Sequence, residues 1–414
     1  MRLVIDIART HLISKPRQTI IAMLGVTFGI GMFIAMVSLM TGLNNFTEEL
    51  TMTSSPDIHI YHDVTESRPS VIEQVNVGGI NKVHHQKPKN ETPRLRNAHQ
   101  IAALIRRDPR VTGVAPSISS QVFYNYGPVQ LSGNILGVDI IEEDKLFELR
   151  EKMKEGRIED LKANHDGIIM GRGLARKLNA RTGDRVVITT PQGYTMTLKI
   201  VGVFQMGLGS IDNVRSYANL STVQTILQQD HLYVTDINIK LKDLLLAKSI
   251  APGYQRMYGY KAEDWETANA TFLTGNIIRN ILTYSVSITL LIVAGFGIYN
   301  ILNMTIYNKM KDIAILKAMG FAGRDVKQIF MIQSLVIGFI GSLLGLAIGY
   351  GLSLLIAQAP FNGGDFISLD HFPVNFDPKY YIIGIVFGVT TTAFAGYMPS
   401  RKASKIDPIE ILRG

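Results

Sequence analysis

The sequence predicts a membrane α-helical protein with four transmembrane helices and an extracytoplasmic α+β domain between the first and second helices. Four uncharged apolar stretches predict the crossings, because a bilayer-spanning helix needs about 20 apolar residues. Residues 44–277 separate the first stretch from the second and have the mixed polarity of a folded domain. The positive charge also gathers beside the apolar stretches, as it does beside the cytoplasmic ends of membrane helices.

The net charge of +8 is carried by short flanking segments. Residues 44–277 hold 27 Lys/Arg and 26 Asp/Glu, whereas 1–19, 307–327 and 401–414 together hold 13 basic and 5 acidic residues. This asymmetry predicts that the three segments are cytoplasmic. A nucleic-acid-binding protein would more often carry a basic face on its folded domain. There is no cysteine, which excludes disulfides and thiolate metal sites.

Residues 1–19 are predicted to form a cytoplasmic amphipathic N-terminal helix. Apolar and uncharged residues recur at helical spacing in Val4, Ile7, Ala8, His11 and Leu12. Such a helix would lie on the inner membrane surface, and the alternative is a plain basic flank. Residues 20–43 follow as the first transmembrane helix, because they lack the short apolar core and the small-residue cleavage site of a secretory signal.

The periplasmic α+β domain is expected at 44–277, with helical stalks at both ends. Alternating polarity predicts strands at Asp57–His62, Arg185–Thr190, Thr195–Phe204 and Asp236–Leu241. Several strands are expected within Val111–Asp139, with turns at Gly127-Pro128 and Gly133-Asn134. Helices are expected at Ala98–Arg107, Ile141–Lys162 and Leu220–Gln229. The Pro-, Gly- and Asn-rich stretch Val64–Asn97 predicts a long loop.

The remaining chain alternates between membrane helices and short connections. Transmembrane helices are predicted at 278–307, 328–358 and 380–400. They are joined by a cytoplasmic coupling helix at 308–327 and a short periplasmic loop at 359–379, and a cytoplasmic tail follows at 401–414. Glycines recur every fourth residue in Gly25/Gly29, Gly341/Gly345/Gly349 and Gly384/Gly388, and Gly295 with Gly297 fits this pattern more loosely. This spacing predicts close helix contacts, although glycine is also simply common in membrane helices.

The segment Lys309–Lys327 carries the clearest functional signal. Ile313, Leu316 and Met319 form an apolar face too short to span a membrane, and Gly320 suits a helix C-terminus. The face could lodge in a groove on a cytosolic protein; the alternative is a surface turn with a packed face. No Asp, Glu, Lys, Arg or His lies inside the apolar runs of the crossings, the second of which begins at Ile281, and this absence disfavours ion-driven transport. The energy is therefore expected from a partner.

Other signals are weaker. Five of the nine histidines lie between His59 and His99, in an irregular stretch that gives little reason to expect a metal site. No G-x-x-x-x-G-K-[ST] motif occurs, so no phosphate-binding loop of that kind is expected. Gly171-Arg-Gly173 lacks the context of a dinucleotide-binding motif and predicts a turn. No catalytic residues and no metal ligands are predicted.

Two motifs resemble those of a known family. Asp312-Ile-Ala-Ile-Leu-Lys317 with Met319-Gly320, and the tail Pro399-Ser-Arg-Lys-Ala-Ser-Lys-Ile-Asp-Pro-Ile-Glu410, resemble permeases of the mechanotransmission (type VII) ABC transporter family, which includes MacB, FtsX and LolC/LolE. Asn44-Asn45-Phe46, Gly171–Asp184 and Phe204–Leu220 look most like the lipoprotein-releasing LolC/LolE branch. The resemblance covers nearly the whole chain.

The resemblance implies a permease that is not itself an enzyme. Two permeases would pair, as identical copies or paralogues, and each would bind a cytosolic ABC ATPase that holds ATP and Mg; no cofactor is expected on this chain. It further implies that the motion of the ATPase is transmitted to the periplasmic domain. The implied ATPase-coupling residues are Lys309, Lys311, Asp312, Ile313, Leu316, Lys317, Met319 and Gly320.

In the lipoprotein branch a lipidated substrate enters between the first and second helices of paired subunits. Carried onto this chain, that implies a substrate-binding region around Met36, Leu39, Met40, Leu43, Ile281 and Ile288. Methionines make an adaptable apolar surface, but simple exposure to lipid explains the same pattern. A lipoprotein substrate, membrane lipid and a periplasmic carrier or adaptor are the further partners implied.

One departure bears on the carrier. The hook that LolC-type subunits offer to a periplasmic carrier should interrupt the strand region before Thr195–Phe204, where only Pro191-Gln-Gly193 is present. The chain therefore looks nearer the LolE or MacB type. The alternatives to lipoprotein release are a MacB-type permease that drives peptide, toxin or drug export with an adaptor, and FtsX-like transmembrane signalling. All three place the chain in the cell inner membrane, with both termini cytoplasmic.

Overall fold

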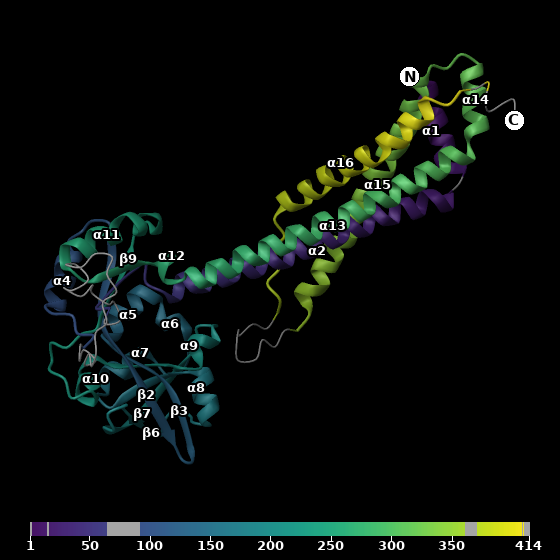
Figure 1. The fold of residues 1–414 in the computed structure, drawn as a ribbon. Helices are drawn as coiled ribbons and strands as arrows, with labels where there is room; N and C mark the ends of the chain where they lie inside the picture. Colours follow the sequence, from purple (N-terminus) through teal and green to yellow (C-terminus); the bar gives the residue numbers. More distant parts are fainter. Residues whose placement is uncertain (1, 15, 64–91, 361–370, 408, 410–414) are drawn as a thin grey trace, which may run out of the picture. The chain divides into compact units, whose positions relative to one another are not determined.

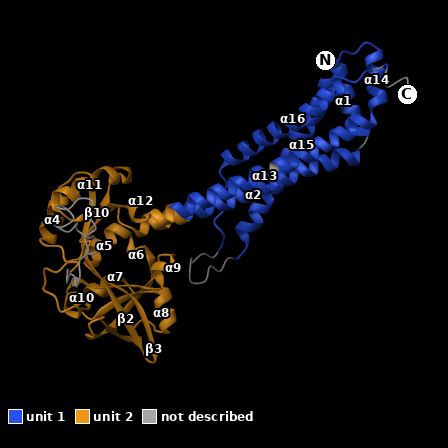
Figure 2. Cartoon of the chain, in the orientation of Figure 1, with its two compact units in different colours: residues 1–46, 274–361, 370–414 blue, residues 47–273, 362–369 orange. Residues whose placement is uncertain are grey.

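The computed structural model describes residues 2–14, 16–63, 92–360, 371–407 and 409. Two compact units are distinguished (Figure 2): unit 1 is residues 1–46, 274–361 and 370–414, and unit 2 is residues 47–273 and 362–369. Most of the predicted loop Val64–Asn97, much of the loop 359–379 and the end of the tail lie outside the described residues.

Unit 1 is helical. Among the described residues, four helices are long and apolar enough to cross a membrane, in agreement with the four predicted crossings. They are α2 (Pro16–Ser54), α13 (Ala270–Asn308), α15 (Gly323–Gln358) and α16 (Pro378–Ser404). Two short helices, α1 (Arg2–Ser14) and α14 (Met310–Ala318), accompany them at one end of the unit (Figure 1).

Small residues set the spacing between α2 and α15. A Cβ atom at Gly345 would lie 2.9 Å from the carbonyl oxygen of Thr27, and one at Gly349 would lie 2.9 Å from that of Gly31. The hydroxyl of Thr27 donates a hydrogen bond of 3.1 Å to the Gly341 carbonyl. The close contact predicted for the three α15 glycines is therefore present, and it is the kind of approach that only glycine permits.

The glycine pattern does not hold everywhere. Gly384 and Gly388 of α16 face α2, near Ile34 and Ile30 respectively. Gly25 and Gly297, in contrast, would have nothing within 4 Å of an added Cβ atom. At those two positions the spacing predicted a close contact that this chain does not make, because regular spacing alone cannot show which helix face meets a neighbour.

Unit 2 contains one mixed sheet, which has ten strands in the described part of the chain. The order is β10-β1-β9-β2-β3-β8-β5-β7-β4, and β6 pairs with β2 and β7. The strands are β1 (Ile58–Tyr61), β2 (Val111–Tyr126), β3 (Val129–Val138), β4 (Met153–Glu155), β5 (Gly167–Gly171), β6 (Arg185–Thr189), β7 (Thr195–Phe204), β8 (Arg215–Asn219), β9 (Asp236–Leu241) and β10 (Lys261–Asp264).

Short helices pack on this sheet through buried aliphatic and aromatic side chains. They are α4 (Ala98–Ile105), α5 (Ile140–Phe147), α6 (Leu149–Lys152), α7 (Ile158–Ala163), α8 (Arg172–Leu178), α9 (Gly209–Asp212), α10 (Leu220–Ile226), the 3₁₀ helix η1 (Leu244–Leu246), α11 (Ala247–Tyr258) and α12 (Trp265–Ala268). The segment before β7 is a hairpin turn in which Gly193 has φ +89°.

Two local predictions were wrong. The turn expected at Gly133-Asn134 is absent, and β3 runs straight through it; glycine is needed there because the Val214 carbonyl lies against its Cα. The single helix expected at Ile141–Lys162 is divided, because Glu148 adopts a left-handed conformation with φ 51°. The chain then forms β4, which pairs with β7.

The end of α2 is tied to the sheet by a buried ion pair. Lys240 Nζ donates to Asp57 Oδ1 at 2.9 Å and to the carbonyl of Met52 at 2.8 Å, while Asp57 Oδ2 accepts from the backbone N–H of Leu241 at 2.8 Å. Asp57 is only 5% exposed. A buried charge needs such partners, so this contact fixes the last turn of α2 against β9.

Candidate functional site

Helix α14 is the short helix between the membrane-length helices α13 and α15. Asp312 lies in its first turn and Lys317 in its last, which suits the helix dipole. The chain leaves the helix through Gly320, whose φ of +101° is a left-handed conformation that glycine adopts without strain. Lys309 Nζ lies 3.5 Å from Asp312 Oδ2 across the first turn.

One side of α14 is buried in unit 1. Ile313 is 1% exposed and packs in a cluster with Ile306, Val326, Phe330 and Ala403. These residues come from α13, α15 and α16. Ile313 therefore packs α14 against three membrane-length helices. Because it is buried, it is not on a surface that a partner could reach.

Leu316 fastens α14 to the N-terminal helix. It packs against a cluster of Val4, Ala8 and Ile329. The α1 stripe Val4/Ile7/Ala8 contacts α14 and α15 of the same chain, and the location of α1 on the inner membrane surface stays a prediction. The stripe had the right spacing for either surface, and spacing alone does not distinguish lipid from a neighbouring helix.

Lys317 joins α14 to the end of α16. Its Nζ donates to the carbonyl oxygens of Ser404 at 2.8 Å and Ile406 at 2.7 Å. The last carbonyls of a helix lack partners within the helix, so Lys317 satisfies groups that would otherwise need water. At Gly323, an added Cβ atom would lie 2.7 Å from the Ser404 carbonyl, which brings the start of α15 to the same point.

The opposite side of α14 is open. Ile315 is 48% exposed and Met319 66% exposed, and Lys311 and Asp312 lie on the same side. A groove of about 420 Å³ runs between this side and α1, lined by Asp6, Ile7, Thr10, His11, Asp312, Ile315 and Leu316. Burial lowers the pKa of His11, and the positive charge of Lys309 lowers it further.

The predicted coupling residues are thus divided between two roles. Ile313, Leu316 and Lys317 hold α14 in unit 1, whereas Lys311, Asp312 and Met319 are available to a partner. The sequence analysis did not single out Ile315 or the α1 residues of the groove. Ile315 could have been found, since it lies four residues before Met319 on one helix face, whereas the approach of α1 leaves no local signal.

The residues predicted to bind substrate lie on two helices, α2 and α13. Met36, Leu39, Met40 and Leu43 recur on one face of α2 and are half-buried. Ile281 and Ile288 are 58% and 48% exposed on α13. The buried positions of that part of α13 are Thr283 and Ser287, which helical geometry puts on the other side of the helix from Ile281.

A polar cluster joins α2 and α13 beside this region. Arg279 donates to the side-chain oxygens of Asn44 and, at 3.2 Å, of Asn276. Asn44 in turn donates to Asn280 at 2.7 Å, and the two helices lie side by side in Figure 1. Asn276, Asn280, Thr283 and Ser287 follow one another on one face of α13, and Arg279, Asn276 and Asn280 make this contact with α2 polar.

Two family profiles match the chain. The profile of the MacB-like periplasmic core domain matches residues 19–250, which is more than half of the sequence. The profile of the FtsX-like permease C-terminal domain matches residues 284–408. Between them, residues 251–283, which include β10, α12 and the start of α13, are not matched.

Similar proteins fall into two groups. The lipoprotein-releasing system transmembrane protein LolC of Xylella fastidiosa is 28% identical over 75% of this chain and 80% of its own. LolC of Haemophilus influenzae is 23% identical over 95% of this chain and 93% of its own. The macrolide export ATP-binding/permease protein MacB of Bartonella quintana is 26% identical over 95% of this chain but only 57% of its own length.

Proposed function

This chain belongs to the ABC transporter permease family defined by the MacB-like periplasmic core domain and the FtsX-like permease domain, and we propose that it releases lipoproteins from the outer leaflet of a bacterial inner membrane. The LolC relatives support this proposal, because their likeness extends over as much as 93% of their length. The work would come from a cytosolic ATPase that binds ATP and Mg, and no reaction is assigned to this chain.

The observation that carries the proposal is the way α14 is built. One side is held by Ile313, Leu316 and Lys317 to α1, α13, α15 and α16. The other side presents apolar Ile315 and Met319 between charged groups. A force applied to the open side would therefore move the helices of unit 1 together, which is what a coupling element must do.

We assign the partner to this open side. The two carboxylates at the groove, Asp6 and Asp312, favour a partner surface with an apolar centre and basic residues around it. The positive flanks of the membrane-length helices favour a cytoplasmic location for α1, α14 and the tail. Unit 2, whose charge is balanced, would then be periplasmic, and a second permease copy or paralogue would complete the assembly.

MacB-type export remains the second candidate, supported by the MacB relatives that align with 95% of this chain. A release assay separates the two. The chain would be co-purified with its cytosolic ATPase and reconstituted with a fluorescent triacylated lipoprotein in proteoliposomes. ATP with a periplasmic carrier should move the lipoprotein into the soluble fraction, and non-hydrolysable ATP should not.

The opposite outcome is equally specific. If ATP releases no lipoprotein, and ATP hydrolysis is instead stimulated by a periplasmic adaptor protein, the MacB-type function replaces the present proposal. If no ATPase co-purifies with the chain, both candidate functions, lipoprotein release and MacB-type export, would be contradicted.

A further inference from the structure

Unit 2 contains a polar cavity of about 230 Å³ beneath helix α5. It lies where the end of α2 meets the sheet, and its lining comes from α2, β1, β2, β3, β8, β9 and α5. The lining residues that carry polar side chains are Ser54, Ser55, His59, Ser117, Ser119, Glu143, Arg215, Asp236 and Asn238. The volume is below the range of about 300–1,000 Å³ that drug-sized ligands occupy, so an occupant would be small.

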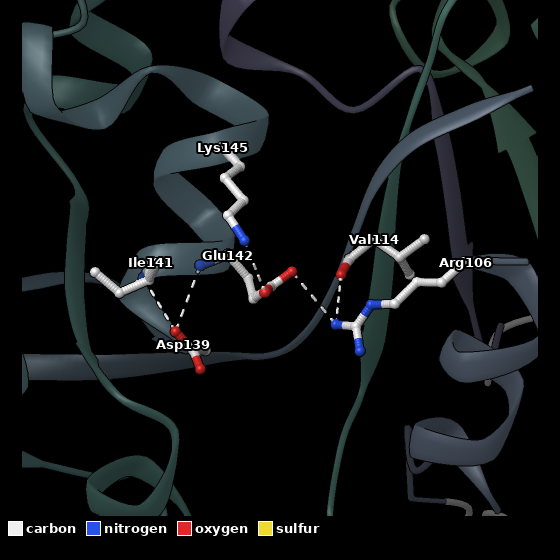
Figure 3. Close-up of polar contacts among 6 residues, drawn as sticks. All are labelled: Arg106, Val114, Asp139, Ile141, Glu142 and Lys145. Atoms are coloured by element: carbon white, nitrogen blue, oxygen red, sulfur yellow. Dashed lines mark hydrogen bonds and ion pairs between the residues drawn. The ribbon is translucent and has the colours of Figure 1, made fainter.

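Glu143 points into this cavity because α5 is fixed in orientation. Asp139 caps the helix by accepting from the backbone N–H groups of Ile141 and Glu142. Glu142 faces outward and binds Lys145 and, at 3.4 Å, Arg106, whose Nη2 also donates to the Val114 carbonyl (Figure 3). The next residue is turned by about 100°, so Glu143 faces inward.

The Glu143 carboxyl is incompletely satisfied. It is 2% exposed, and no described residue hydrogen-bonds its Oε2 atom. No ion pair joins it to Arg215 within the part of the chain that the structure describes, although the positive charge of Arg215 lies in the same cavity. Burial raises the pKa of Glu143 to about 7, and Arg215 only partly offsets this effect. A buried acceptor without a partner is costly.

Four other polar residues of the lining are paired with one another or with Thr235. His59 Nε2 lies 2.7 Å from Asp236 Oδ1, and Asp236 also accepts from Thr235. Asn238 donates to Ser117 at 3.3 Å. The acceptor of this lining that is left without a donor among the described residues is thus Oε2 of Glu143, and a positively charged donor is the kind that binds a carboxylate most strongly.

We propose that the cavity binds a small primary ammonium compound, no larger than an amino acid, whose ammonium group donates to Glu143. An ammonium group supplies three donors and a positive charge. A neutral diol or water supplies donors without the charge. The site is separate from the coupling surface on α14 and from the membrane helices, and it does not depend on what the permease moves.

The test uses two probes of matched size, ethanolamine and ethylene glycol. Binding to the full-length chain in detergent would be measured by isothermal titration calorimetry at pH 8. Ethanolamine should give a saturable signal and ethylene glycol none. Glu143→Gln should abolish the signal, and the control Glu142→Gln, one residue away on the outer face, should retain it.

A second measurement needs no variant. Glu143 is mostly ionised at pH 8 and mostly protonated at pH 5.5, so the affinity of the wild-type chain for ethanolamine should fall by about tenfold or more between these values. Equal binding of both probes, a pH-independent affinity, or full binding by Glu143→Gln would show that Glu143 does not select an ammonium group. Any of these results would overturn the proposal.

Discussion

At position 143 a carboxyl group is buried without an ion-pair partner among the described residues, and the nearby charge of Arg215 only partly offsets the effect of burial. Its pKa is raised by burial to about 7, so the folded chain holds the proton more tightly than the unfolded chain does. Stability should therefore fall as the pH rises from about 4.5 to 7, and the whole penalty should be present above pH 7. The sequence gives no warning of this, since Glu142 and Glu143 look alike in a charged helix.

Glu143→Gln should stabilise unit 2 in the absence of a ligand. Removing the buried charge should raise the free energy of unfolding at pH 8 by about 1–3 kcal/mol and change it little at pH 5. Unfolding can be followed through Trp265, the one tryptophan of the chain, which packs against the core of unit 2. A variant that is less stable at pH 8 would contradict the assigned environment.

Gly345 is a position where the sequence was sufficient to predict a close helix contact. Its place in a run with Gly341 and Gly349 predicted a close helix contact, and an added Cβ atom would lie 2.9 Å from the Thr27 carbonyl. The same residue type at Gly351 has nothing within 4 Å. Gly351 lies outside the four-residue run, so the spacing distinguished the two positions although both are glycines on one membrane-length helix.

Gly345→Val should destabilise unit 1 by about 1–3 kcal/mol, the usual cost of overpacking. Gly351→Val in the same helix is the matched control and should have little effect. Unfolding of the purified chain in mixed micelles, followed by circular dichroism, would compare them. Equal stability of the two variants would mean that α2 and α15 are not in the close contact described.

Among the elements, α14 shows what local spacing can and cannot reveal. Spacing predicted a helix with an apolar face near 313, 316 and 319, and the helix is present. It could not show that Ile313 and Leu316 face the chain's own helices, because periodicity reports a buried face without naming what buries it. The same ambiguity applies to α1, whose periodicity did not show that its apolar stripe contacts α14 and α15.

Ile315→Glu should uncouple the ATPase from substrate release. Ile315 is 48% exposed on the open side of α14, so a charge there should weaken partner binding without disturbing the fold. Leu316→Glu would be a poorer test, because Leu316 also holds α1. The measurement is lipoprotein release per ATP hydrolysed in proteoliposomes, expected to drop about tenfold or more, as loss of a central interface contact can cause.

Met257→Glu is a suitable control, since Met257 is 72% exposed on α11 in unit 2. It changes the same kind of residue to the same charge away from α14. If both Ile315→Glu and Met257→Glu release as much lipoprotein per ATP hydrolysed as the wild-type chain, the open side of α14 is not the partner surface.

At the scale of the whole molecule, the four crossings and the inserted α+β domain were predictable, because each rests on long composition patterns. The ten-stranded order of the sheet was not, since β1 pairs with β9 and β10 across nearly 200 residues of sequence. Pairings of such separation depend on tertiary contacts that no local signal records. The profile matches show which family the chain belongs to, and spacing and charge alone could not show this.

Helix α2 belongs to both units without interruption. It runs from Pro16 to Ser54, about 58 Å at 1.5 Å per residue, and a bilayer core is about 30 Å thick. Replacing Glu48-Glu49 by Gly-Gly would add a point of easy bending at roughly 1 kcal/mol per glycine, whereas Ala-Ala would not.

The glycine pair should leave ATP hydrolysis intact and abolish release, and the alanine pair should preserve both. A permease that tolerates the glycine pair would not use α2 as its transmitting element. If α2 transmits the motion, the load reaches the sheet of unit 2 through the ion pair of Asp57 and Lys240, which holds the last turn of the helix.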